Sequence, residues 1–425
     1  MFALSAATKV YLAAGATDLR KGFEGLCALV EGVLEEAPLS GHVFLFANGA
    51  RTRLKVLVWD GSGLWVCTKK LGRGRYAWPT VGEGESRRVK VLVRKYTDQL
   101  PLYRQAAAFL RDAGVDLSRK TLTGWAMKAG ELLVPVNAAI YREVAAEGYM
   151  QVDESLVPVS DPDTPGANAR GWWWTYSNPR GSVSYEFART RGYVAAVDRL
   201  KHYNGKIQTD GYAVYDKFDH EGFIHLGCWS HARRPFHQLA TVLKKDAPKS
   251  PVCRHAIGIV EAIGKLYAHE RAMREANAPP DVRRAHRQEH SMPVLDLIKQ
   301  KIESAQTDSI PSSKLARACA YVLGQWPKLT RIFDYGEVEL DTNWAENSVR
   351  PLVLGRKNWL HVGSWEAGPR VAAIASVIES SKRLGINPRE YLADVLPRLA
   401  NGTTSEVPSL TPAAWLRHRS GQPAA

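Results

Sequence analysis

The sequence YMQVDESLVPV, at residues 149–159, decides the expected fold of the central part of the chain. Its β-branched and apolar residues predict a β-strand. Asp153 follows the apolar Val152 at the centre of this strand. We therefore rank Asp153 above its neighbour Glu154 as a candidate functional residue.

The residues that follow predict an alternation of strands and helices. We expect strands at 171–177 and 183–190, a helix at 193–203, a strand at 205–210, a short helix, and a strand at 223–228. Three neighbouring strands, then helix, strand, helix and strand, is the order of the RNase H-like fold. The prediction is an α/β chain with an RNase H-like catalytic core, with Asp153 on its first strand and Asp210 at the end of its fourth. Trp172–Trp174 alternate between strand faces, which favours a strand core over a base-stacking platform.

A third acidic residue, Glu346, lies in LDTNWAENSVRPLVLGRKNWLH at residues 340–361. We expect a short helical segment here that Asn343 can cap and that Pro351 stops or kinks. In one interpretation Asn343 and Glu346 form a capping box, and Glu346 only satisfies a backbone donor. In the other, Glu346 binds a metal ion among basic and aromatic residues. The two strand acids favour the metal.

Acids from several elements that converge on one edge are suited to phosphodiester cleavage. Mg²⁺ and Mn²⁺ prefer oxygen ligands, and two such ions about 3.5–4 Å apart stabilise the attacking and leaving oxygens. We expect Asp153, Asp210 and Glu346 to be both the catalytic residues and the ligands of two ions. A lone aspartate at a strand end is more often a turn former, so the prediction depends on all three. Glu154 and Asp216 are neighbouring acids that we rank lower.

The composition indicates a folded basic protein with a polyanionic partner. The net charge is +14, from 57 Lys and Arg against 43 Asp and Glu, and nucleic acid is the commonest partner for such an excess. No apolar run reaches the roughly 18 residues of a membrane span, and the N-terminus lacks the basic start of a signal peptide. Five scattered cysteines without a C-x-x-C pair argue against a disulfide framework. We expect a cytoplasmic protein without a membrane partner.

Residues 1–80 are expected to form a small α/β unit. The pattern predicts a helix at 20–36 and strands at 9–14, 42–48, 51–59 and 64–70. Arg51, Arg53 and Lys55 share one face of the third strand. That face is either a nucleic-acid contact or a solvated sheet surface.

Between this unit and the central strands we expect a joint and a helical segment. Residues 81–94 are rich in glycine and charge, which predicts a linker. In 95–148 we expect a helix at 103–112 and a second at 118–130, capped by Ser118. Two short helices around a glycine fit a helix-turn-helix, although any helical hairpin has the same pattern. Arg119 and Lys120 are its candidate DNA contacts.

The catalytic domain is expected at 149–385, with a helical insertion at about 238–330 that separates the fifth strand from Glu346. Residues 386–425 are expected to hold a helix at 388–399 and a mobile tail rich in Gly, Pro and Ser.

Several motifs resemble, in order, the large transposase subunit of the IS-sixty-six family of bacterial insertion sequences. They are KYTDQLPLYRQ (95–105), VDES (152–155), QTDGY (208–212), CWSHARRPF (228–236), NWAENSVRPLVLGRKNWL (343–360) and SVIESSKRLGINPREYLADVL (376–396). The resemblance covers about residues 90–398. It implies that Asp153, Asp210 and Glu346 are the family's DDE catalytic acids.

A second resemblance covers the N-terminal part. VYLAAGATDLRKGFEGLCALV (10–30) and KVLVWDGSGLWVCTKKLGRGRYAWP (55–79) are similar to the family's small accessory protein, which is normally a separate chain. The polypeptide therefore resembles a fusion joined near residues 80–90. We do not find the coiled-coil segment and Cys-rich zinc-binding module with which the large subunit usually begins.

Cys228 and His231 have three interpretations. DDE families that carry Cys-x-x-His after the fifth strand suggest support of the active site. The alternatives are an incidental core cysteine and a zinc site, which would lack two of its four ligands.

Basic residues near the acids are expected to bind DNA. They are Arg233, Arg350, Arg356 and Lys357, and we expect the three after Glu346 to contact phosphates without selecting a sequence. The alternative is that Arg356 pairs with an acid and holds the loop against the core.

Two functions follow from the sequence. The first is a DNA transposase that hydrolyses the ends of an insertion sequence and joins the freed 3′ hydroxyls to target DNA. Its expected partners are the inverted-repeat ends, target DNA, further copies of itself and other transposition proteins of the element. The second is an inactive remnant that binds element ends as a regulator.

Overall fold

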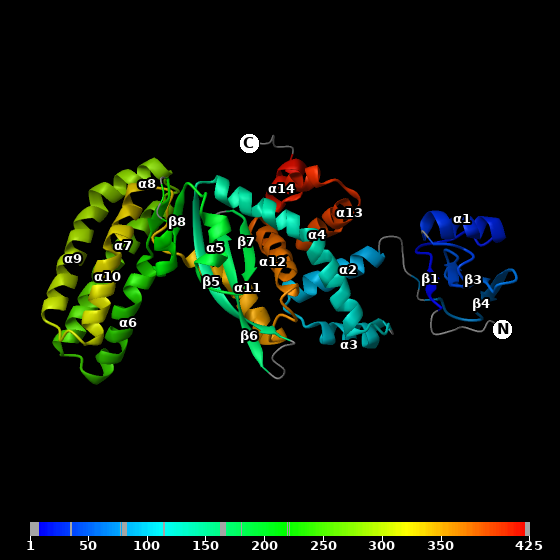
Figure 1. The fold of residues 1–425 in the computed structure, drawn as a ribbon, viewed down its shortest axis with the longest axis horizontal. Coiled ribbons are helices and arrows are strands. Elements are labelled where there is room, and N and C mark those ends of the chain that lie inside the picture. The colour runs from blue at the N-terminus through cyan, green and yellow to red at the C-terminus, as the bar shows by residue number, and fades with distance from the viewer. Residues whose placement is uncertain are drawn as a thin grey trace. The chain divides into compact units, whose positions relative to one another are not determined.

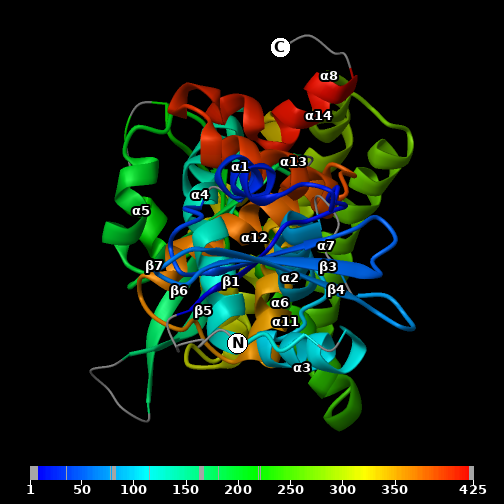
Figure 2. The same cartoon turned by 90° about the vertical axis from the view of Figure 1, so that its right-hand side faces the viewer.

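The computed structural model describes residues 8–34, 36–76, 78, 83–113, 115–161, 167–179, 181–218, 220 and 222–420, with the backbone alone at 83–87. It divides into two compact units, Met1–Val91 and Leu92–Ala425, drawn in two views (Figures 1 and 2). In the described part of the chain, no helix is both long enough and apolar enough to cross a membrane.

The first unit is a four-stranded sheet with a helix on one face. Its strands are β1 (Val10–Leu12), β2 (Val43–Ala47), β3 (Arg53–Trp59) and β4 (Leu64–Lys70), in that spatial order, and β1 is parallel to β2. Helix α1 (Phe23–Val33) covers one face (Figure 2), where Leu26 and Val30 pack on Phe44, Phe46 and Leu57. The four predicted strands and the helix are therefore present.

The basic residues of β3 lie on the face that carries α1. Arg53 and Lys55 are four and two residues before Leu57, which is buried under the helix, so all three share a face. Lys55 Nζ donates a hydrogen bond to the backbone oxygen of Lys21, at 2.8 Å. This contact uses one of the predicted DNA-facing cations to hold the segment before α1.

The segment predicted as a joint is helical, because α2 spans Glu83–Tyr96. Val89, Leu92 and Tyr96 are buried at the spacing of one helix face. The glycine and the charges before them hid this period from the sequence analysis. The boundary between the two units, after Val91, lies inside the predicted joint.

The predicted pair of short helices is also different in the structure. Helix α3 spans Leu102–Ala113, and Ser118 caps α4 as expected, accepting from the Thr121 N–H at 3.1 Å. However, α4 spans Arg119–Ala146 and runs through Gly130 and Pro135. A Cβ at Gly130 would lie 2.8 Å from the backbone oxygen of Arg370. This glycine therefore permits close helix packing and does not end the helix.

The second unit is built on a five-stranded mixed sheet. The spatial order is β7-β6-β5-β8-β9, with β8 and β9 parallel to β5, and β6 antiparallel to both β5 and β7. The strands are β5 (Tyr149–Ser160), β6 (Asn168–Ser177), β7 (Val183–Ala188), β8 (Lys206–Gln208) and β9 (Ile224–Leu226). Helix α5 (Tyr193–Leu200) precedes β8, and a 3₁₀ turn, η1 (Ala213–Lys217), follows it. This α/β order agrees with the predicted elements, and Trp173 and Trp174 are buried in the strand as expected.

A group of helices lies beside the short parallel strands (Figure 1). It contains α6 (Trp229–Asp246), α7 (Pro251–Glu275), α8 (Pro280–His286), the π-turn η2 (Arg287–Ser291), α9 (Met292–Thr307) and α10 (Lys314–Thr330), followed by the 3₁₀ turn η3 (Arg331–Asp334). Its apolar core, with Ile263, Ile298 and Val322, is continuous with Tyr149 and Leu226 of the sheet. The predicted insertion is therefore a helical layer that shares the core of the sheet.

Of the remaining helices, two pack on β5, β6 and β7 of the sheet, and the other two pack on helices behind it. In chain order they are α11 (Asn343–Trp359), α12 (Ala367–Arg383), α13 (Pro388–Asn401) and α14 (Pro412–Ser420), with the 3₁₀ turn η4 (Thr404–Leu410) before α14. Helix α11 continues through Pro351, where we expected a stop or a kink, because burial of Val349, Leu352 and Gly355 outweighs the local cost of proline.

The tail predicted as mobile is structured up to Ser420. Trp415 of α14 packs edge-on against Tyr391 and donates to Asp394 at 2.7 Å. These contacts join the tail to α13, a docking that its Gly, Pro and Ser content did not indicate. Residues 421–425 lie outside the described residues.

Candidate active site

Asp153 and Asp210 lie on neighbouring parallel segments. The register pairs Gln151 of β5 with Gln208 of β8, and each aspartate is two residues after one of these glutamines. Asp210 therefore lies just beyond the end of β8, beside the strand that carries Asp153. Its carboxylate accepts the Tyr212 N–H at 2.9 Å, which holds the turn in which it lies.

Glu346 is in the first turn of α11 and does not form the capping box. Thr342 occupies the N-cap position, but its side chain makes no capping bond to the helix, and the Asn343 N–H donates to the carboxylate of Asp341 at 3.2 Å. The Glu346 carboxylate instead faces α6, where Oε1 is 3.6 Å from His231 Nε2 and 3.4 Å from Arg234 Nη2. The capping interpretation is therefore wrong for this side chain.

The charges of Asp210 and Glu346 both act on the Asp153 carboxyl. Burial raises the pKa of Asp153 to about 7, and the charges of Glu154, Asp210 and Glu346 contribute to the increase. Like charges close together disfavour ionisation, so the site has an excess of negative charge that a cation would relieve. In the part of the chain that the structure describes, however, no three His, Cys, Asp or Glu side chains converge closely enough to hold a metal ion.

The two acids that we ranked lower have other partners. Buried Glu154 pairs with Arg191 at 3.1 Å, and the Tyr215 hydroxyl also bonds its carboxylate. Asp216 is 3.0 Å from His225 Nδ1 and 2.5 Å from Lys328 Nζ. Glu154 is therefore held by Arg191 and Tyr215, and Asp216 by His225 and Lys328.

Arg191 is a site residue that the sequence analysis missed. Its guanidinium joins Glu154 to Asp210, with Nη2 3.7 Å from Asp210 Oδ2, and lies over the Tyr212 ring at 4.0 Å. It follows β7 in a short connection, RTRGY at 189–193, that has no recognisable motif. Its contacts with Glu154 and Asp210 form only in the folded structure.

Cys228 and His231 connect the start of α6 to the start of α11. His231 Nδ1 is 3.2 Å from the Cys228 sulfur, and the Thr342 backbone N–H and hydroxyl each donate to this sulfur at 3.4 Å. Burial raises the pKa of the Cys228 thiol to about 11. Within the described residues, no further His, Cys, Asp or Glu converges with these two to complete a zinc site, so the contacts favour support of the active site over zinc.

The basic residues predicted to bind DNA lie in different environments. Arg350 and Lys357 are exposed on α11, and Arg119 and Lys120 are exposed in the first turn of α4. Arg233 is half-buried. Arg356 donates to the backbone oxygen of Leu156 in β5 at 2.6 Å, so it holds the helix against the strand through a carbonyl oxygen.

Asp153→Asn should stabilise the metal-free protein, and the gain should grow between pH 4 and pH 7. Folding raises the pKa of this carboxyl from 3.8 to about 7, so the native state binds the proton more tightly and loses stability as the pH rises. The shift corresponds to at most on the order of 4 kcal/mol. Urea unfolding in EDTA at pH 5 and pH 8 measures the gain.

The control for this prediction is Asp198→Asn, because the Asp198 side chain is 87% exposed and should have no comparable pH-dependent effect. A gain from Asp153→Asn that is equal at the two pH values, or a loss at pH 8, would contradict the prediction.

Comparison with known protein families matches residues 8–370 to two related families. Residues 83–370 match the family described as "Transposase IS66 family". Residues 8–97 match the family described as "IS66 Orf2 like protein". Both halves of the predicted fusion are therefore present in one polypeptide.

Three curated proteins from one organism are similar in sequence to parts of this chain. Proteins y4jD and y4qI of Sinorhizobium fredii (strain NBRC 101917 / NGR234), each named an uncharacterized protein, are both 31% identical over 79% and 76% of this chain. The matches cover 66% and 61% of those relatives, so the chain spans less than two thirds of their length. A shorter relative from the same organism, y4hO, is 42% identical over 76 residues, which is 18% of this chain and 66% of the relative.

The order of the sheet, the placement of the acids and these matches lead to one assignment. The family match extends from α2 into α12 and includes Asp153, Asp210 and Glu346. The chain belongs to the IS66 transposase family and carries an IS66 Orf2-like segment at its N-terminus.

Proposed function

We propose that this protein is a DDE transposase with an RNase H-like core, which hydrolyses the ends of an insertion sequence and transfers the freed 3′ hydroxyls to target DNA. The observation that carries the proposal is the placement of Asp153 on β5 beside Asp210 at the end of β8, with Glu346 close enough for its charge to add to the rise that burial and Glu154 cause in the pKa of Asp153. Family membership supports the reaction class. The strand order, with β8 and β9 parallel to β5, supports the core.

The donor set fits two Mg²⁺ or Mn²⁺ ions. Asp153, Asp210 and Glu346 offer carboxylate oxygens, which hard divalent cations prefer, and the repulsion at Asp153 disfavours the site without a cation. When bound, the two ions would stabilise the attacking and leaving oxygens of phosphodiester cleavage. In the described residues these carboxylates do not converge closely enough to coordinate one metal ion. We therefore expect them to move closer to one another when metal and DNA bind.

Other residues of the chain would orient the acids and the DNA. His231 and Arg234 hold the Glu346 carboxylate from α6, and Arg191 holds that of Asp210. Exposed Arg350 and Lys357 on α11 would bind phosphates beside the scissile bond. Further copies of the chain and other proteins of the element are proposed partners in the complex with DNA.

The test is an end-cleavage assay with the full chain, a duplex carrying the terminal inverted repeat of its element, and Mn²⁺ or Mg²⁺. We expect strands with free 3′ hydroxyls and joined products, both absent in EDTA. A shifted duplex without nicked or joined product would favour the DNA-binding regulator instead. Absence of both binding and cleavage would contradict both functions.

Replacing Arg350 and Lys357 with alanine should flatten the salt dependence of DNA binding. Each phosphate contact releases about 0.9 counterion, so the slope of log K against log salt should fall by about two, equally for end DNA and random duplex. Fluorescence anisotropy at several salt concentrations measures the slope.

Arg356→Ala is the matched comparison, because its guanidinium already binds the Leu156 oxygen. We expect this variant to lose thermal stability and to change the slope by less than the double variant does. An unchanged slope in the double variant would exclude α11 as a phosphate contact.

A further inference from the structure

We propose that Gln151 is a positioning residue that fixes the three acids relative to one another. The inference rests on the proposed function and adds to it a residue that touches neither DNA nor metal. Gln151 is fully buried in β5, two residues before Asp153. Because side chains alternate along a strand, Gln151 and Asp153 point to the same face of the sheet.

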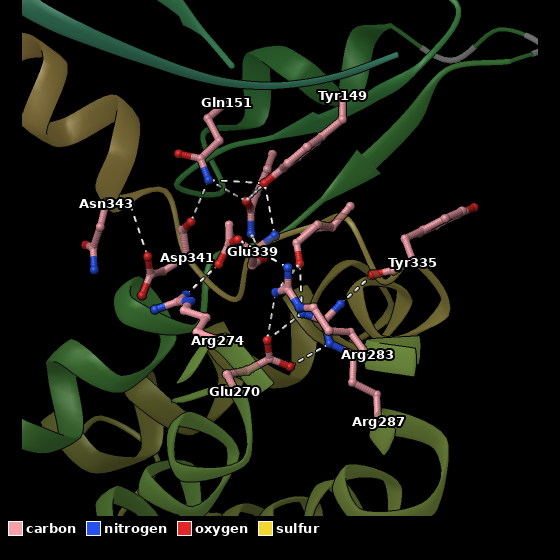
Figure 3. A network of polar contacts seen from close by, with 12 residues as sticks. Tyr149, Gln151, Glu270, Arg274, Arg283, Arg287, Tyr335, Glu339, Asp341 and Asn343 are labelled. Atoms are coloured by element: carbon pink, nitrogen blue, oxygen red, sulfur yellow. Dashed lines mark hydrogen bonds and ion pairs between the residues drawn. The ribbon is translucent and has the colours of Figure 1, made fainter. Parts of the chain in front are cut away.

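The amide of Gln151 bonds both β8 and the start of α11. Its Nε2 donates to Gln208 Oε1 at 3.0 Å and to the backbone oxygen of Asp341 at 2.7 Å. Its Oε1 accepts the backbone N–H of Ala345 at 3.1 Å. One side chain therefore binds a neighbouring strand and caps a helix, and Figure 3 shows it between Tyr149 and Asp341.

Two partners of Gln151 lie one or two residues before an acid in the sequence. Gln208 lies two residues before Asp210, and Ala345 immediately precedes Glu346. The N–H of Ala345 is one of the first-turn donors that have no partner within α11. Its bond to Gln151 therefore sets where that turn begins. Movement of this amide would therefore shift Glu346 relative to both aspartates.

Gln208 and Tyr149 continue the same connection. Gln208 Nε2 donates to the backbone oxygens of Gly227 at 2.9 Å and Glu339 at 2.8 Å. The Tyr149 hydroxyl donates to Gln208 Oε1 at 2.6 Å and accepts the Glu339 N–H at 3.2 Å. The segment before α11 is thus bound along its length to the ends of β5 and β8.

A buried amide in an apolar layer needs all of its partners. Without them, burying it costs free energy that a methionine of similar size would not. Gln151 has partners in β8 and at the start of α11, and each of these places leads to one of the acids. A positioning residue needs such bonds, because the orientation of metal ligands depends on the hydrogen bonds of the residues around them.

The experiment compares Gln151→Met and Gln151→Asn with a matched control, Asn137→Leu. Methionine keeps the size and removes every hydrogen bond, whereas asparagine keeps the amide on a side chain too short to reach both β8 and α11. Asn137 is also a buried amide, which donates to the Tyr185 oxygen at 2.8 Å and accepts from Ser184 at 2.9 Å. Its partners are in β7, so its loss should affect stability without affecting the acids.

Two measurements on the full chain are read together. Mn²⁺ binding, followed by the electron paramagnetic resonance signal of the free ion, should weaken roughly 10–100-fold in both Gln151 variants and stay within about twofold in Asn137→Leu. Amide hydrogen exchange in metal-free protein should accelerate at 343–349 in the Gln151 variants and not in the control.

The outcomes separate this inference from the proposed function. Folded Gln151 variants with the Mn²⁺ affinity of the wild type, or with unchanged exchange at 343–349, overturn the positioning role while the proposed function stands. Equal weakening of Mn²⁺ binding in Asn137→Leu also overturns it, because general loss of packing would then be the cause. Wild-type protein that binds no Mn²⁺ and cuts no end DNA overturns the proposed function and this inference together.

Discussion

Asp210→Asn should abolish divalent-metal-dependent cleavage of element ends while leaving the fold intact. Asparagine has the same shape and can still accept the Tyr212 N–H, which Asp210 accepts at 2.9 Å. It lacks the negative charge that a hard cation requires. Replacing a residue that only hydrogen-bonds a metal ligand already lowers affinity or activity about 10–100-fold. Replacing a ligand itself should therefore lower cleavage more than about 100-fold. The end-cleavage assay with Mn²⁺ measures the effect.

Asp216→Asn is the matched control for this prediction. It is an aspartate on the 3₁₀ turn that follows the same strand, but its carboxylate bonds His225 and Lys328. We expect this variant to lose some stability and to keep cleavage within a few-fold of the wild type. Equal cleavage by Asp210→Asn and wild type would remove Asp210 from the catalytic set.

Arg287→Met should be the most destabilising single substitution among the polar residues of the helical insertion. The Arg287 side chain is fully buried and forks onto Glu270, with Nε 2.6 Å from one oxygen and Nη2 2.8 Å from the other. Arg287→Met leaves the buried Glu270 carboxylate with Arg283 but without its fork, and loss of a buried ion-pair partner costs about 3–5 kcal/mol. Urea unfolding at pH 7 measures the loss.

The surroundings of Glu270 explain the size of this effect. Burial raises the pKa of Glu270, but the hydrogen bonds and charges of Arg287 and Arg283 outweigh burial and lower it overall. Arg283 connects Glu270, at 2.9 Å, to Glu339, at 3.4 Å, and Arg287 Nη2 also donates to the Val338 oxygen at 2.7 Å. Figure 3 shows this network joining α7 and α8 to the segment before α11.

The pH dependence gives a second check on the same substitution. Because folding lowers the pKa of Glu270 from its ordinary value of 4.5, its ionised form contributes stability above that pH, and this contribution is lost on acidification. The difference between wild type and Arg287→Met should therefore shrink as the pH falls below 4.5 and through the lowered pKa of Glu270 in the native state.

An exposed ion pair provides the control for Arg287→Met. Arg398 and Asp394 are 3.4 Å apart on α13 and about half exposed, so Arg398→Met should cost about 0.5 kcal/mol or less. A loss below about 1 kcal/mol for Arg287→Met would mean that the network does not stabilise the insertion.

The sequence by itself determined the order of the elements and selected the three candidate acids. Strand periodicity and turn residues are local signals, and they were sufficient to predict β5 to β9 with Asp153 and Asp210 at their expected places. The basic and aromatic residues around Glu346 indicated the third acid, and the family motifs added the fusion with the Orf2-like segment. These features depend on residues that are close together in the chain, which is why they could be predicted.

Only the tertiary structure decided the lengths of α4 and α11 and the partners of the buried polar residues. Gly130 and Pro351 favour helix ends locally, but packing against α12 and the burial of Val349 and Leu352 keep both helices continuous. Gln151 bonds Ala345 across 194 residues of sequence, and Arg191 reaches Glu154 across 37. Periodicity contains no information about such distant pairs, because they form only when the folded core brings the strands, the insertion and α11 together.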